Sequence, residues 1–259
     1  MKKYLISLEK DLYRRQLFFS QSCTTDFILF NAINTMHENS EKLTALFDLD
    51  KFKKHYLREV TKGEIGCTLS HLSIYKIISE DDSINDDEYC LICEDDALFD
   101  INFEHSLNCI LKSQINKDII LLGQSKIPSF SNVELEISYP ITLPFLSRKI
   151  SDTKYKYAYP YKNYFAGTVA YLIKKSAVNK IINDEHHIVP FWLADDYPLF
   201  GSYFKLDICV IRPLLAIENP TLTSNLEDLR GSYRDYFWKK LFKYPLKKIL
   251  AIKRNLFYL

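Results

Sequence analysis

The sequence lacks any long hydrophobic run. Among its 259 residues, no uninterrupted apolar stretch approaches the roughly 20 residues that a helix needs to cross a bilayer. Near the N-terminus, the apolar stretch 4–8 ends at Glu9 and is too short for the core of a signal peptide. We therefore expect a cytoplasmic protein.

An excess of charge of either sign is also missing. The chain has 34 Lys and Arg against 33 Asp and Glu, so its net charge favours neither a nucleic acid nor an acidic partner. Hydrophobic residues make up 47% of the chain, which excludes disorder and is enough to form a real core. Because internal repeats and low-complexity linkers are absent too, we expect one main domain, 1–225, followed by a C-terminal segment, 226–259.

The cysteines show no pattern of a disulfide framework. Cys90 and Cys93 form a C-x-x-C pair, but a zinc site would need a second Cys or His pair at matching spacing, and the sequence offers none. The pair also lies within a predicted strand, which favours small apolar core residues over a redox site. We interpret the cysteines as free, mostly buried thiols in a reducing compartment. They are Cys23, Cys67, Cys90, Cys93, Cys109 and Cys209.

Runs typical of strands alternate with segments typical of helices. The strand-like runs lie at 4–8, 27–30, 89–93, 118–122, 168–173 and 207–211. This alternation predicts an α/β domain with a largely parallel central sheet. The best-marked helix begins after Thr61, because Thr61 and Glu64 stand at the spacing of a capping box. The apolar residues that then recur every three or four positions predict its buried face. They are Ile65, Leu69, Leu72, Tyr75 and Ile78.

Two segments depart from this alternation. The stretch 124–162 is rich in proline and aromatic residues without periodicity, and predicts an irregular insertion over one face of the domain. The tail 236–259 carries seven Lys or Arg and no acid, interleaved with apolar residues, which suits an anionic membrane surface. The alternative is a terminal helix packed on the domain with its lysines in water. Pro245 should divide the tail into two short helices.

Three consecutive carboxylates, Glu94, Asp95 and Asp96, follow the predicted strand 89–93 directly. Ligands of α/β sheets gather at the carboxyl ends of strands, so the three acids should lie at a binding edge. Like charges side by side repel, and a divalent cation would offset the repulsion while leaving coordination positions for phosphate oxygens. The alternative is an acidic turn without function.

Polar residues within the helix after Thr61 form a second candidate group. Gly63 and Gly66 lie near the start of the helix, where bare amides favour anions. Ser70 and His71 are polar residues in an otherwise apolar segment, although a lone buried histidine is more often structural than functional.

Two further motifs lie late in the domain. Gly167 and Thr168 precede a strand, at a place where a ligand could approach the backbone closely. Asp195 and Asp196 stand among aromatic residues, an arrangement that suits carbohydrate recognition and a general base of raised basicity. A surface acidic pair beside core aromatics is the alternative. The aromatic residues are Phe191, Trp192 and Tyr197.

Taken together and in order, the stretches "ISLEKDLYRR", "GEIGCTLSHLSIYK", "LICEDDALF", "LLGQS", "FAGTVAYLIKKSA" and "ADDYPLF" resemble glycosyltransferase family 25, in particular the bacterial lipooligosaccharide β-galactosyltransferases. The resemblance covers roughly residues 2–224. It implies a GT-A-like, Rossmann-like fold, a UDP-sugar donor, usually UDP-galactose, and Mn(II) or another divalent cation. It also implies transfer with inversion of the anomeric centre.

The resemblance implies roles for single residues. The three acids match a DxD-like motif, with Asp96 as the first choice of metal ligand, Glu94 as the second, and Asp95 in contact with the ribose or the sugar. One of Asp195 and Asp196 is implied as the catalytic base, and Asp196 is our narrow preference. The remaining residues implied at the donor are Leu8, Arg14, Arg15, Glu64, Ser70, His71, Gly167 and Thr168.

The leading hypothesis is a metal-dependent transfer of a hexose from a UDP-sugar to the oligosaccharide of a lipooligosaccharide or lipopolysaccharide. The reaction would take place at the inner membrane, to which the tail would attach the protein peripherally. UDP-glucose or a UDP-N-acetylhexosamine could replace UDP-galactose as donor. Nucleotidyl or phosphoryl transfer is a second alternative, but it lacks support. The sequence contains no G-x-x-x-x-G-K-[ST] loop, which enzymes of that kind often use. A catalytically silent protein that binds carbohydrate or membrane is the alternative outside enzymes.

Overall fold

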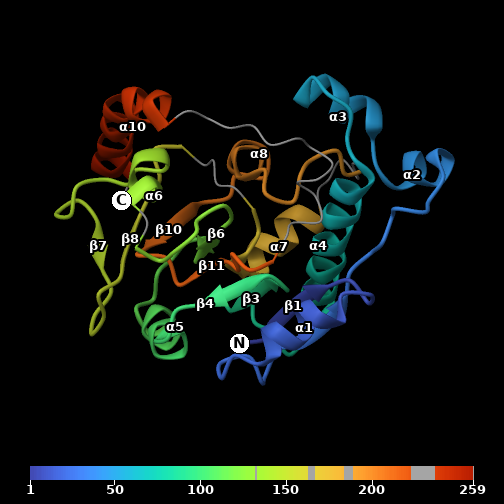
Figure 1. The fold of residues 1–259 in the computed structure, drawn as a ribbon, viewed down its shortest axis with the longest axis horizontal. Coiled ribbons are helices and arrows are strands. Elements are labelled where there is room, and N and C mark those ends of the chain that lie inside the picture. The colour runs from blue at the N-terminus through green and yellow to red at the C-terminus, as the bar shows by residue number, and fades with distance from the viewer. Residues whose placement is uncertain (132, 163–166, 184–188, 223–236, 259) are drawn as a thin grey trace.

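The computed structural model of the chain describes residues 1–131, 133–162, 167–183, 189–222 and 237–258 (Figure 1). Within this part of the chain the central sheet has eight strands, in the order β2-β1-β3-β9-β5-β10-β8-β7. In that order the strands span Ile28–Asn31, Lys3–Ser7, Tyr89–Glu94, Ala170–Lys174, Ile119–Leu121, Ile208–Arg212, Lys156–Ala158 and Arg148–Lys149. All the strand-like runs of the sequence are strands here, with small shifts of their ends.

Strand β9 makes the sheet mixed. β1 runs parallel to β2 and β3, and β5 runs parallel to β10. β9, however, lies antiparallel between β3 and β5, and β8 and β7 continue the sheet in antiparallel pairs. The expectation of a largely parallel sheet is therefore wrong. All residues of β9 are buried, and a strand buried on both faces has the same continuous apolar sequence whichever way it runs.

Helices cover both faces of the sheet (Figure 1). One face carries α4 (Lys62–Glu80), α7 (Lys175–Ile182) and α8 (Tyr197–Ser202), and the other carries α1 (Leu12–Phe19) and α5 (Phe103–Lys112). Side chains of β3 alternate between the two cores, with Cys90 on the first face and Cys93 on the second. Both thiols are buried and free, as are the other buried thiols, which confirms the C-x-x-C pair as core filling.

The long helix α4 begins as its sequence predicts. Thr61 is the N-cap, its hydroxyl accepts from the backbone of Glu64, and the Glu64 carboxylate accepts from the Thr61 amide at 2.8 Å. Ile65, Tyr75 and Ile78 of the predicted apolar face are buried. The buried surface of α4 is wider than that stripe, because polar side chains facing the site are enclosed as well.

The stretch after β5 is less irregular than expected. It begins with β6 (Gly123–Gln124), which pairs with β11 (Ala216–Glu218), and β11 pairs in turn with β4 (Ala97–Phe99) to form a second sheet. It continues through α6 (Val133–Ser138) and then supplies β7 and β8 to the edge of the central sheet. These elements have only two to six residues each, which is too short to produce a recognisable periodicity.

Two short helices, α2 (Ser40–Leu46) and α3 (Leu49–Tyr56), lie beside the N-terminal half of α4 (Figure 1). Leu43, Phe47 and Phe52 are buried there against Ile65 of α4. This small separate core holds α3 next to the loop that leads into α8.

The described part of the C-terminal segment forms one helix, α10 (Phe237–Tyr258), with Pro245 in its interior. The expected division into two helices is therefore wrong. Pro245 is exposed, so the carbonyl of Leu241, which loses its helical donor, can be hydrated by solvent. No helix of the described residues is long and apolar enough to cross a membrane.

Candidate active site

A cavity of about 260 Å³ opens at the carboxyl end of β1 and β3, next to the first turns of α4. The three consecutive acids line its floor. Of the other residues expected at the donor, Leu8, Arg14 and Ser70 also line it. Sequence reasoning missed the cavity residues Ala32, Ile33, Asn34, Thr35 and Met36. Lys10, Asp11 and Cys67 also line the cavity and lie in stretches that carried the family resemblance, although none of them was given a role of its own.

Residues 33–36, which follow β2, form one wall of this cavity. A signal for them was present, because β2 is the neighbour of β1 and its carboxyl end lies at the same edge. Gly66 lets α4 approach this wall, since a Cβ at Gly66 would lie 2.6 Å from the carbonyl oxygen of Ile33. The wall is fixed further by Ser70 Oγ, which accepts from the Ile33 amide at 2.8 Å.

Arg14 of α1 offsets part of the repulsion among the three acids. Its Nε donates to Asp95 Oδ1 at 2.6 Å, and its Nη2 donates to Asp96 Oδ2 at 2.8 Å. Ser7 Oγ donates to the second oxygen of Asp95 at 2.6 Å. Burial alone would lower the pKa of Arg14, but the two carboxylates raise it above its usual value. Arg14 is therefore a fixed cation between two acids of the cavity floor.

Asp96 retains an acceptor that no described group satisfies. The residue is 8% exposed, and its Oδ1 is buried without a hydrogen-bond partner among the described residues. Burial first, and then the charge of Glu94, raise its pKa to about 8, against the opposing effect of Arg14. A buried carboxylate with an unsatisfied oxygen and acidic neighbours fits a hard divalent cation.

Glu94 faces α4 instead of Arg14. Its Oε1 lies 3.5 Å from His71 Nε2 and 3.8 Å from Cys67 Sγ, and Thr168 donates a hydrogen bond to the same oxygen. Burial would raise the pKa of Glu94, but His71 and Thr168 lower it below its usual value. Cys67 and Glu94 line the cavity, whereas His71 is buried behind them.

The two late aspartates have different surroundings. Asp196 is the N-cap of α8, where its Oδ1 accepts from the Leu199 amide at 3.0 Å and its Oδ2 accepts from the Tyr56 hydroxyl. Burial, followed by this hydrogen bond, raises the pKa of Tyr56. Asp195 Oδ2 accepts from the Gly167 amide at 2.9 Å. Neither aspartate lines the cavity, although Gly167 joins Asp195 to Thr168 and so to the site.

Gly167 must be glycine where it stands. Its φ is +78°, and a Cβ there would lie 1.8 Å from Ser125 Oγ. The close approach at this motif is therefore to the Ser125 side chain of the same protein.

The other expected donor residues have structural partners. Glu64 is buried at the start of α4, and its two oxygens accept from Arg58 at 2.6 and 2.9 Å. Arg15 donates to Ser7 Oγ at 2.9 Å and to Asn31 Oδ1 at 2.8 Å, and so ties the ends of β1 and β2 together. Neither lines the cavity; Arg15 supports its edge from outside.

The fold and the cavity define an α/β protein in which acids at the end of a central strand line a cavity. Comparison with known families agrees with this class. The chain belongs to glycosyltransferase family 25, because the model of that family, described as "LPS biosynthesis protein", matches residues 1–198. The resemblance carried by the sequence motifs is thus confirmed.

Curated relatives are similar over parts of the chain. Procollagen galactosyltransferase 1-B of Xenopus laevis is 27% identical over 185 residues, which are 69% of this chain and 26% of that protein. Procollagen galactosyltransferase 2 of Mus musculus is 31% identical over 96 residues, 32% of this chain and 15% of that protein. The chain therefore matches about a quarter or less of the length of these relatives.

Proposed function

We propose that this protein transfers a hexose from a UDP-sugar to a glycan acceptor, with inversion of the anomeric centre, on a GT-A-like domain. The observation that carries the proposal is the acidic triplet at the end of β3, which lines a cavity next to the first turns of α4. Galactose is the hexose of first choice, since the similar curated proteins are named galactosyltransferases. The family description favours a lipopolysaccharide or lipooligosaccharide oligosaccharide as acceptor.

The cavity residues suit a nucleoside diphosphate. Lys10 brings positive charge to a cavity that is also lined by Gly63 in the first turn of α4, where helix amides favour anions. Asp95, held by Ser7 and Arg14, would contact the ribose or the sugar. Mn(II) or a similar hard cation fits Asp96, with Glu94 as the second ligand, and would stabilise negative charge on the departing diphosphate.

We place the catalytic base at Asp195, and this choice reverses the narrow preference for Asp196. Both oxygens of Asp196 are engaged in holding α8 and Tyr56. Asp195 is linked through Gly167 and Thr168 to Glu94. In an inverting displacement the base removes the proton of the acceptor hydroxyl while its oxygen attacks C1, and UDP leaves from the opposite face.

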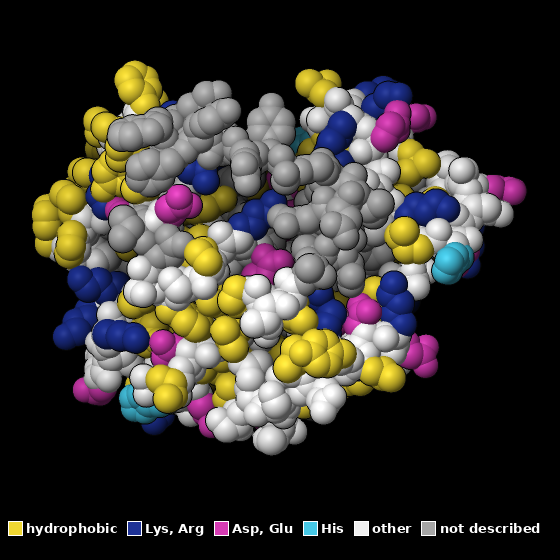
Figure 2. Space-filling model, in the orientation of Figure 1, with side chains coloured by type: hydrophobic (Ala, Val, Ile, Leu, Met, Phe, Trp, Pro, Cys, Tyr) yellow, Lys and Arg dark blue, Asp and Glu magenta, His cyan; other side chains and the backbone are white. Residues whose placement is uncertain are grey.

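The outer face of α10 favours a membrane-bound acceptor. The inner face of the helix is held by Lys248, which donates to Glu136 at 2.6 Å, and by Asn255, whose amide donates to the Tyr159 carbonyl at 2.7 Å. Apolar side chains at three- and four-residue steps are exposed on the outer face instead, at the upper left of Figure 2. They are Phe242, Leu246, Ile249, Leu250, Leu256 and Phe257.

Exposed Lys243 and Lys253 accompany this apolar face. A helix whose apolar side faces outward with lysines beside it suits the surface of an anionic bilayer. We therefore propose peripheral attachment to the inner membrane through α10. Liposomes of phosphatidylglycerol and phosphatidylethanolamine should sediment the protein. The double variant Phe242→Ser with Phe257→Ser should abolish this, whereas Ile101→Ser, at an exposed position next to α5, should not.

The transferase proposal is tested by UDP release with Mn(II) and a panel of UDP-galactose, UDP-glucose and the two UDP-N-acetylhexosamines. Each donor is combined with lactose- or glucose-terminated acceptors, with EDTA as control. One donor should turn over only with metal and acceptor. Asp96→Asn should weaken UDP binding and remove turnover, while Asp82→Asn, in an exposed acidic turn, should change neither.

Absence of metal-dependent UDP binding would support the silent carbohydrate- or membrane-binding alternative. Turnover of UDP-glucose or of a UDP-N-acetylhexosamine would keep the reaction and change the donor. Absence of both binding and turnover would contradict the proposed function.

A further inference from the structure

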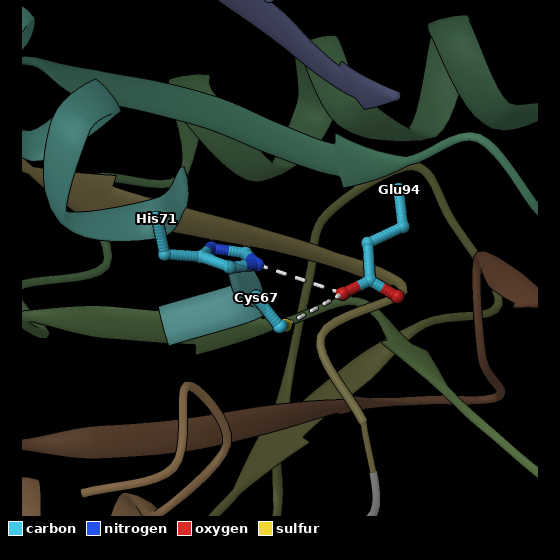
Figure 3. A group of neighbouring side chains, drawn as sticks. All are labelled: Cys67, His71 and Glu94. Carbon is cyan, nitrogen blue, oxygen red and sulfur yellow. Dashed lines mark hydrogen bonds and ion pairs between the residues drawn. The ribbon is translucent and has the colours of Figure 1, made fainter. Parts of the chain in front are cut away.

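Cys67, His71 and Glu94 meet beside the cavity in a way that transfer from a UDP-sugar does not require (Figure 3). Cys67 and His71 lie four residues apart on α4, so both side chains project from one face of the helix. Glu94, at the end of β3, faces them. We propose that these three side chains bind a transition-metal ion of the zinc class, at a position separate from the unsatisfied oxygen of Asp96.

The distances match a tetrahedral ion. Zinc at about 2.0–2.1 Å from nitrogen or oxygen and about 2.3 Å from sulfur separates a nitrogen and an oxygen ligand by about 3.4 Å, and a sulfur and an oxygen ligand by about 3.6 Å. The His71 Nε2 to Glu94 Oε1 distance is 3.5 Å and the Cys67 Sγ to Glu94 Oε1 distance is 3.8 Å. The third pair, the Cys67 sulfur and the His71 nitrogen, lies within 4.8 Å, so side-chain shifts of about 1 Å or less would bring all three ligands to one ion.

His71 carries the independent evidence for a ligand. It is 1% exposed, and its Nε2 is buried without a hydrogen-bond partner among the described residues. Its other nitrogen, Nδ1, lies 2.7 Å from the Tyr171 hydroxyl, which lies 2.8 Å from the Tyr75 hydroxyl. When Nδ1 donates to Tyr171, Nε2 presents a lone pair toward Glu94. Metal-bound histidines are held by outer partners of this kind.

A lone pair and a carboxylate facing each other inside a protein require a cation between them. A proton on His71 is one such cation, and the pair would then be an ion pair. Cys67 distinguishes the two cases, because an ion pair needs no thiol, whereas a thiolate beside an imidazole and a carboxylate is typical of zinc. Binding would release the thiol proton to solvent. Since Cys67 and Glu94 line the cavity, a fourth position would face the cavity.

The test uses the full chain after removal of metals by a chelator, titrated with Co(II), which takes zinc sites and reports its ligands by absorption. We expect one Co(II) per chain with a near-ultraviolet charge-transfer band from a cobalt–thiolate bond, displaced by Zn(II) and not by Mg(II). Cys67→Ser should remove the band and weaken Zn(II) binding by more than the roughly 100-fold that loss of an outer partner costs.

Two variants serve as controls. Cys109→Ser removes a thiol that also has a histidine four residues away, His105, at 3.7 Å, yet no metal-binding group that includes it is found in the described part of the chain. Asp96→Asn removes the carboxylate assigned to the hard cation. Both should keep the band. Its loss in Cys109→Ser, its persistence in Cys67→Ser, or its absence from the unchanged protein would overturn the proposal.

A measurement on the unchanged protein covers the case in which Cys67→Ser fails to fold. Zn(II) should slow alkylation of Cys67, read by peptide mass spectrometry, while alkylation of Cys109 and Cys23 keeps its rate. Equal rates for Cys67 with and without Zn(II) would refute the site. Neither readout depends on a UDP-sugar, so the metal site and the transferase can fail independently.

Discussion

Replacing Arg14 by methionine should strongly destabilise the protein, and the effect should depend on pH. The Arg14 guanidinium donates to both Asp95 and Asp96, and the three side chains are only 14%, 8% and 11% exposed. Methionine retains most of the volume and removes the charge. Two carboxylates then remain in a buried floor without their cation.

Breaking a buried ion pair from one side costs about 3–5 kcal/mol, because the partner is left as an uncompensated buried charge. Arg15 on the same helix provides the control, since its partners are the neutral Ser7 and Asn31. Loss of its hydrogen bonds leaves no buried charge, and Arg15→Met should cost about 1–2 kcal/mol. Adding Asp95→Asn and Asp96→Asn to Arg14→Met should recover most of the loss.

The pH dependence follows from the direction of the pKa shift. In the folded protein the pKa of Asp96 is raised to about 8, whereas an unfolded aspartate titrates near pH 4. A carboxyl whose folded pKa is raised binds its proton more tightly in the folded state, so its contribution to stability falls as pH rises between these values. Without Arg14 the pKa rises further. Below about pH 8 Asp96 keeps its proton in the folded state of both proteins, so its contribution to the difference between variant and parent should be constant there and should grow above pH 8.

Urea unfolding followed by far-ultraviolet circular dichroism, at several pH values and without divalent ions, gives the free energies of unfolding. Equal losses for Arg14→Met and Arg15→Met would refute the assignment of Arg14 as the cation of the site. A loss for Arg14→Met that does not grow between pH 7 and pH 9 would refute its electrostatic origin.

Three further outcomes are expected. Asp195→Asn should reduce turnover by roughly 10²-fold with UDP affinity unchanged, measured by UDP release and calorimetry, and normal turnover would move the base elsewhere. Asp196→Ala should instead lower the free energy of unfolding by about 1 kcal/mol through loss of the α8 cap, and unchanged stability in urea would contradict that role. Gly167→Ala should destabilise the protein by more than 1 kcal/mol because its φ is +78° and Ser125 fills the space of a Cβ; a neutral or stabilising effect would show that the loop relaxes.

Local signals in the sequence predicted much of the fold. The capping box at Thr61 and Glu64 depends on residues three apart, and α4 begins there. The acids after 89–93 lie at a binding edge because strand ends of an α/β sheet lie there whatever the rest of the chain does. The sequence also contains a signal for the N-cap role of Asp196, since an aspartate followed two residues later by Pro198 is typical of a helix start. The aromatic neighbours of Asp196 favoured a catalytic role instead.

The features of the fold and site that the sequence did not predict depend on contacts between distant parts of the chain. Arg14 and Asp95 are 81 residues apart, and nothing local distinguishes Arg14, which faces the acids, from Arg15, which faces Ser7. The direction of β9 depends on its place between β3 and β5. Cys67 and Glu94 come together only if α4 packs at one particular position along β3. The sequence of either element alone does not predict this position.

The repulsion within the acidic triplet is resolved by giving each carboxylate a different partner. Because successive residues at the end of a strand point to opposite sides, Glu94 turns to His71 and Thr168, while Asp95 turns to Arg14 and Ser7. Asp96 shares Arg14 and retains one unsatisfied oxygen. A hard cation and a zinc-class ion would share Glu94 and differ in their other ligands, since the first would depend on Asp96 and the second on the sulfur and nitrogen of α4. Glu94, common to both proposals, is the residue whose replacement should affect both kinds of binding.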